Sequence, residues 1–103
     1  MEYNNDVFTN FLKEYKCAVN NLSYVTLDEL SIEEWNKKLI DANNLYTKKR
    51  NNFQAIKTIL DDEECTEVVK LLFQLYEYVN YVKRKYEEKI LTDKLNLTKI
   101  YEV

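Results

Sequence analysis

The sequence contains no glycine, no proline and no histidine among its 103 residues. Phosphate-binding loops and dinucleotide-binding fingerprints depend on glycine, because they need backbone conformations that other residues adopt only at a cost. Histidine is the commonest general base and the commonest metal ligand in proteins, so its absence argues against catalysis and against a metal site. We therefore predict that the chain is not an enzyme, that it has no catalytic residues and that it uses no cofactor or metal.

Cysteine is also scarce, with only Cys17 and Cys65 present and neither in a Cys-x-x-Cys pattern. A structural zinc site needs four ligands, and two distant thiols do not supply them. Free cysteine behaves as a small hydrophobic residue. We expect both side chains to be buried as free thiols on helix faces.

No charge of one sign dominates, because 15 basic residues stand against 18 acidic residues, a net charge of −3. A nucleic-acid-binding surface normally carries a strong positive field, so no nucleic-acid partner is expected. The basic clusters Lys48–Arg50 and Lys83–Lys85 are interpreted as cations near helix C-termini, where they complement the helix dipole. The chain has neither a membrane-spanning apolar run nor a secretory leader at its start, and this predicts a cytoplasmic protein without a membrane partner.

The lack of glycine and proline removes the usual residues of tight turns and favours an all-helical fold. Apolar residues recur at steps of three and four from Phe8 to Leu22, which predicts a first helix beginning after Asn5 or Asp6. The stretch of residues 23–30 interrupts this pattern. Thr26 with Glu29, and Ser31 with Glu34, both have the spacing of a capping box. A second helix over residues 32–60 is expected to begin after Ser31.

The acidic residues 61–64 suit the first turn of a third helix, where carboxylates meet the positive end of the dipole. The apolar seam of that helix runs from Cys65 to Tyr86. Thr92 or Asp93 is expected to cap a short last helix. The prediction is one domain over residues 1–103, an all-α, up-and-down antiparallel bundle with three long helices and a short C-terminal helix.

Residues 72–88, LFQLYEYVNYVKRKYEE, carry apolar side chains on nearly every side of the predicted third helix. One interpretation is that this is the central helix of the bundle, covered all round by its neighbours. The other is that one flank is open for a partner protein. On helical spacing we expect Tyr76 to close the bundle and the opposite flank to be accessible. The predicted partner-binding residues are Leu71, Leu75, Tyr78 and Tyr81.

Three short motifs follow one another in the last two-thirds of the chain: Asp41-Ala42-Asn43, then Leu75-Tyr76-Glu77-Tyr78-Val79, then Leu91-Thr92-Asp93-Lys94-Leu95. In this order they resemble the flagellin-specific export chaperones of the FliS type. The resemblance implies a four-helix-bundle chaperone that holds the disordered, helix-forming C-terminal tail of an export substrate. The resemblance also implies that four residues belong either to the bundle core or to the contact with that tail: Leu75, Tyr76, Tyr78 and Val79.

Three functions remain open at this point. The first is a binding protein for another protein's amphipathic or disordered helical segment, most similar to a flagellar export chaperone. The second is a small phage- or plasmid-encoded inhibitor or immunity protein that binds a host protein or a toxin. The third is a structural subunit whose helices pair with copies of themselves, which leaves a homodimer open.

Overall fold

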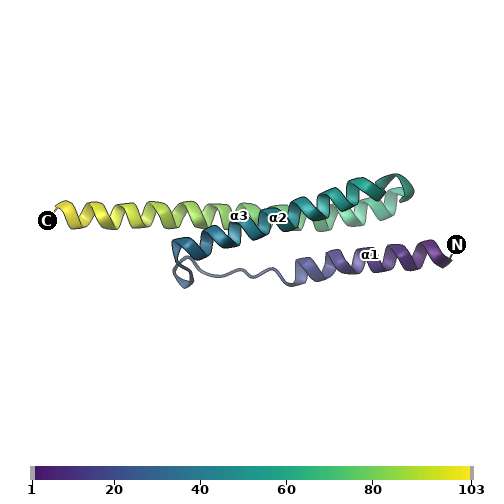
Figure 1. Ribbon diagram of the computed structural model, residues 1–103, viewed down its shortest axis with the longest axis horizontal. Coiled ribbons are helices and arrows are strands. Elements are labelled where there is room, and N and C mark those ends of the chain that lie inside the picture. Colours follow the sequence, from purple (N-terminus) through teal and green to yellow (C-terminus); the bar gives the residue numbers. More distant parts are fainter. Residues whose placement is uncertain (1, 103) are drawn as a thin grey trace.

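The computed structural model describes the backbone of residues 2–102 and the side chains of residues 8–95. Three helices run up, down and up: α1 (Glu2–Asn20), α2 (Ile32–Ile56) and α3 (Asp62–Glu102) (Figure 1). Two short 3-10 turns, η1 (Leu27–Glu29) and η2 (Lys57–Ile59), lie in the connections, and no strand occurs within residues 2–102. The predicted all-α antiparallel bundle is confirmed.

Capping boxes set the starts of α2 and α3. The Glu34 amide donates to the Ser31 hydroxyl oxygen at 3.2 Å, and the Ser31 amide donates to the Glu34 carboxylate at 3.1 Å. Asp61 and Glu64 form the same reciprocal pair ahead of α3, at 2.8 and 2.9 Å. Each box satisfies two amides that a helix N-terminus leaves unpaired. The capping box predicted at Thr26 is wrong, because the Thr26 side chain makes no capping hydrogen bond.

The predicted short fourth helix is not separate, because α3 continues without a break through Leu91, Thr92 and Asp93 to Glu102. Thr92 and Asp93 cap a helix only where the preceding backbone has left the helical conformation. The glycine or proline that would commonly end a helix there does not occur in the chain. The result is one 41-residue helix whose C-terminal part extends beyond α1 and α2 (Figure 1).

The buried side chains form two clusters along the bundle. The first joins all three helices through Leu12, Tyr15, Phe53, Val68, Leu72 and Leu75. The second joins α2 and α3 through Trp35, Ala42, Tyr78, Val79 and Val82. Among the side chains that the structure describes, up to residue 95, neither cluster contains a residue beyond Tyr86.

The bundle is long and thin, with principal extents of 72 × 20 × 17 Å. Among the described residues, no helix has the length and apolarity needed to cross a membrane. The two thiols are free, as expected, but they are not buried: Cys17 is exposed and Cys65 is half-buried. Cys17 lies near the end of α1 and is exposed, so burial of this thiol was wrongly predicted.

Candidate partner-binding groove

Three tyrosines of the bundle donate hydrogen bonds from their hydroxyl groups to backbone carbonyls. Tyr78 donates to the Ser23 carbonyl at 3.0 Å, Tyr81 donates to the Val25 carbonyl, and Tyr15 donates to the Lys49 carbonyl. The Ser23 and Val25 carbonyls belong to the irregular segment 22–26, which has no secondary structure to pair them. A backbone carbonyl without a partner is costly when it is covered by protein. Tyr78 and Tyr81 therefore fasten the α1–α2 connection to α3.

The flank of α3 that was expected to be accessible is covered. Leu75 is 1% exposed and Tyr78 is 5% exposed, while Leu71 and Tyr81 are half-buried. Tyr76, which was expected to close the bundle, is 46% exposed. The predicted order of exposure is therefore reversed. Helical spacing separates the two flanks correctly, but it does not say which of them α1 and the segment 22–26 cover.

The open flank of α3 carries three large apolar side chains. Val69 is 50% exposed, Phe73 is 58% exposed and Tyr76 is 46% exposed. They lie one helical turn apart, so they form a continuous stripe. This stripe faces solvent over the half of α3 that packs against α2.

Side chains of α2 complete a hollow of about 340 Å³ beside that stripe. We call it the α2–α3 groove, and its lining residues are Tyr46, Arg50, Phe53, Gln54, Val69, Leu72, Phe73 and Tyr76. The floor is apolar, since Phe53 and Leu72 belong to the first core cluster. The rings of Tyr46 and Tyr76 meet across the groove with their centroids 5.5 Å apart.

The polar groups of the groove are unpaired within the described part of the chain. The hydroxyls of Tyr46 and Tyr76 form none of the hydrogen bonds that the other tyrosines make to the backbone. Arg50 takes part in neither of the ion pairs, which join Lys49 to Glu14 and Lys85 to Glu88. Two phenols and one guanidinium at the rim of an apolar floor are suited to recognise a second molecule.

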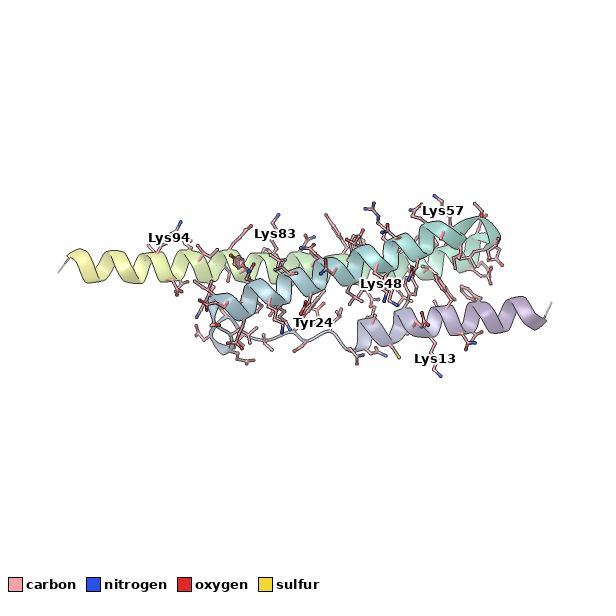
Figure 2. The ribbon with its side chains drawn as sticks, viewed as in Figure 1. Lys13, Tyr24, Lys48, Lys57, Lys83 and Lys94 are labelled. Atoms are coloured by element: carbon pink, nitrogen blue, oxygen red, sulfur yellow. The ribbon has the colours of Figure 1, made fainter. Side chains whose placement is uncertain are left out.

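Two lysines and one arginine lie on this side of the α2–α3 pair. Figure 2 shows Lys57 and Lys83 projecting from the side of the α2–α3 pair that faces away from α1, while Lys13 projects from α1 in the opposite direction. Arg50 lines the groove itself. Arg50 is the charged residue among those that line the groove, and its guanidinium can pair with a carboxylate of a ligand.

We next consider metal ligands and shifted pKa values among the described residues. They contain no group of three or more histidine, cysteine, aspartate or glutamate side chains that could hold a metal ion. Partial burial, with added repulsion from Tyr78 and Glu77, raises the pKa of Tyr24 above its ordinary value, so this phenol stays protonated at neutral pH. The arrangement supports binding through shape, apolar contact and charge.

Comparison of the chain with protein-family models, with curated proteins and with solved structures finds no match. Sequence reasoning missed the contribution of α2 to the groove, including Tyr46 and Arg50. The available signal was the apolar character of α3 around Tyr76, a residue that was expected to close the bundle.

Proposed function

We propose that the chain is a non-enzymatic protein-binding module that holds an amphipathic helix of another protein in the α2–α3 groove. The observation that carries the proposal is the exposed stripe Val69, Phe73 and Tyr76 beside an apolar floor. Covering a large apolar side chain contributes roughly 1.5–3 kcal/mol relative to leaving it in water. The groove therefore offers a partner helix a substantial binding free energy.

The topology explains why a helix is the fitting occupant. The α2–α3 pair has two lengthwise grooves, and α1 fills one of them through Leu12 and Tyr15. A helix in the other groove completes a four-helix bundle, in which each helix buries its apolar stripe against its neighbours. Recognition would follow the helix-in-groove mode, with apolar anchors at every third or fourth residue of the partner.

The charges define the partner further. Arg50 at the rim, with Lys57 and Lys83 on the same side, favours acidic residues flanking the apolar stripe of the partner helix. Tyr46 and Tyr76 offer hydroxyl groups to polar atoms at the edge of the contact. Opposite charges around an apolar centre are the usual anatomy of a protein interface.

The finer proposal is a cytoplasmic chaperone similar to those of flagellar export, and the support for it is the sequence resemblance over residues 32–103. In this role the groove would cover the helical tail of a substrate and prevent its premature assembly. We place the tail on the Val69–Phe73–Tyr76 flank, whereas Tyr78 and Leu75 serve the core. An inhibitor of a host or toxin protein would use the same groove on a different partner.

The test measures binding of a fluorescent flagellin C-terminal peptide by anisotropy, beside a designed acidic amphipathic helix. The double variant Phe73→Ser with Tyr76→Ser removes the exposed anchors, and we expect binding to weaken at least 30-fold, the scale of about 2 kcal/mol. Ile40→Ser is the matched control, because Ile40 is 50% exposed on α2 but does not line the groove. The control should bind as the native chain does.

Equal loss of binding in the control and in the double variant would refute the groove. Binding of the designed helix without binding of the flagellin peptide would support the module and reject the flagellar substrate. Failure of both peptides to bind the native chain would reject the proposed function.

A further inference from the structure

The helix α1 contributes little to the buried core that α2 and α3 form. Among its described side chains, those of residues 8–20, only Leu12 and Tyr15 are buried, and both belong to the first core cluster. The buried residues of the second cluster, which include the fully buried Trp35 and Val82, all come from α2 and α3. The two capping boxes are made by residues 31–64. The α2–α3 pair therefore has a buried core and helix starts that do not involve α1.

An open hollow separates α1 from α2 over part of their length. Its volume is about 720 Å³, and the residues that line it include Cys17 and Ala18 of α1 and Leu45 of α2. Two interactions cross from α1 to α2 here: the Tyr15 hydroxyl donates to the Lys49 carbonyl, and the Lys49 ammonium lies 3.9 Å from the Glu14 carboxylate. The Glu14 side chain is 69% exposed, so solvent screens this ion pair. Sparse packing of this kind marks an element that opens locally.

The connection between α1 and α2 is fastened to α3 by two tyrosines one helical turn apart. The Tyr78 hydroxyl donates to the Ser23 carbonyl at 3.0 Å, and the Tyr81 hydroxyl donates to the Val25 carbonyl. The intervening Tyr24 packs on both tyrosines, with its ring centroid 5.1 Å from that of Tyr78 and 4.9 Å from that of Tyr81. We call these five residues the tyrosine clasp.

The chain is anchored to the α2–α3 pair directly after the clasp. The indole N–H of Trp35 donates to the Leu27 carbonyl at 3.0 Å, and the Trp35 side chain is fully buried. Leu30 packs against the second core cluster. Thr26 lies between the clasp and this anchor, in an extended conformation, and its side chain makes no capping bond. A hinge for α1 is therefore located at Thr26.

We infer that α1 and residues 21–25 form a hinged lid, which the tyrosine clasp holds closed over an apolar side of the α2–α3 pair. The lid covers the side that carries Val68 and Leu75, which are 0% and 1% exposed. When the clasp releases, α1 moves away as one unit about Thr26, and the second core cluster holds the α2–α3 pair together. The freed hydroxyls and carbonyls bond to water instead, so the net cost of releasing them is modest.

The lid gives the chain a second apolar face that only its open state presents. This inference goes beyond the proposed binding in the α2–α3 groove and does not rest on it, because α1 fills the other lengthwise groove of the pair. Opening is a native-state fluctuation that precedes global unfolding, as is found for elements with few buried contacts.

Hydrogen exchange of the native chain, followed by mass spectrometry, measures the opening helix by helix. We expect residues 12–20 to share one protection factor that is lower than those of residues 38–53 and 72–82. In the double variant Tyr78→Phe with Tyr81→Phe, both rings remain and both hydroxyl bonds are lost. Exchange over residues 12–20 should then rise at least tenfold, roughly the effect of two such bonds, while the other two ranges change less than about twofold.

The matched control is Tyr46→Phe with Tyr76→Phe. It also removes two hydroxyls, but these make no bond to the backbone and lie in the α2–α3 groove. Exchange over residues 12–20 should stay within about twofold of the native rate. Protection that rises steadily from residue 12 to residue 20 would indicate simple fraying of the helix end and would contradict a lid.

A second experiment measures access to the covered side by thiol labelling. In a chain with Cys17→Ser and Cys65→Ser, Val68→Cys and Val82→Cys each place one thiol at a fully buried position of α3. Val68 belongs to the cluster that includes the buried residues of α1, whereas Val82 belongs to the other cluster. Iodoacetamide should therefore label the first thiol at least tenfold faster, on the order expected for local against global opening. Circular dichroism verifies that both variants fold.

Three results would overturn the inference. The first is equal protection of all three helices, which would make the bundle one cooperative unit. The second is a Tyr78→Phe, Tyr81→Phe variant that leaves the exchange of residues 12–20 unchanged or raises exchange in every helix alike. The third is equal labelling of the two buried thiols. Peptide binding to the α2–α3 groove is measured separately by anisotropy, so either proposal can fail without the other.

Discussion

The tyrosines of this protein divide into two kinds by what their hydroxyl groups do. Tyr15, Tyr78 and Tyr81 donate to backbone carbonyls that lie in other elements, whereas Tyr46 and Tyr76 make no such bond and border the groove. Tyr15 is completely buried, and Lys49 adds a cation 5.2 Å from the centre of its ring. A tyrosine that is buried and bonded serves stability, and one that is exposed and unbonded is available to a partner.

Replacing Tyr15 with Phe removes its hydrogen bond to the Lys49 carbonyl and keeps the ring. We expect a loss of about 1 kcal/mol at pH 7, the usual net value of one such bond, seen as a fall in melting temperature. Burial, aided by the nearby Glu14 carboxylate, raises the pKa of Tyr15 from 10.0 to about 12. Between these values the unfolded chain releases a proton that the folded chain retains, so the stability due to the neutral phenol falls as pH rises.

The same variant therefore gives a pH signature. The advantage of the native chain over Tyr15→Phe is full below about pH 10 and should shrink as pH rises from about 10 to about 12. Thermal melts of both proteins across that range measure it, and lysine titration affects the two proteins alike. A constant difference across the range would show that Tyr15 is not protected from ionisation.

At the scale of the elements, the starts of the helices depend on two side chains outside them. The side chains of Ser31 and Asp61 each accept a hydrogen bond from the amide three residues later in the chain. In return, the carboxylates of Glu34 and Glu64 accept hydrogen bonds from the amides of Ser31 and Asp61. The substitutions Ser31→Ala and Asp61→Ala should each cost about 1 kcal/mol. Thr26→Ala is the matched control and should cost much less, because the Thr26 side chain makes no capping bond. Chemical denaturation of the three variants measures these costs.

The elements were predictable to different degrees. The Ser31 and Asp61 boundaries follow from local spacing, because the groups that form each box are three residues apart. The continuity of α3 could not be read from Thr92 and Asp93, since these residues are tolerated inside a helix as well as at its cap. Local patterns offer two acceptable states at that point, and the sequence supplies no glycine or proline to exclude one of them.

At the scale of the whole molecule, the two core clusters define the part that must fold together. Within residues 8–95, whose side chains are described, neither cluster includes a residue after Tyr86. A chain shortened to end at Lys89 should therefore keep its fold and, in dilute solution, melt within about 4 °C of the native protein, a change below about 1 kcal/mol. A fall of more than about 10 °C would place the end of α3 in the folding unit.

The candidate site was harder to predict than the fold for a reason that concerns the whole molecule. Periodicity along α3 separates the flank of Tyr76 from that of Tyr78, and this separation is correct. The side on which α1 packs depends on how the connection of residues 22–26 crosses α3, and hydroxyl bonds across more than fifty residues fix that crossing. Such distant pairs leave no trace in local spacing, so the open side of α3 could be identified only from the structure.

The length of α3 has a consequence for how this protein moves through a fluid. The radius of gyration is 18.6 Å, whereas a compact domain of about 100 residues has a value of about 13 Å. Friction in solution follows length more than mass, so a single copy diffuses slowly and elutes early from a sizing column. Elution volume is therefore a poor guide to the oligomeric state of this elongated protein. Light scattering, which measures molar mass independently of shape, is the suitable measurement.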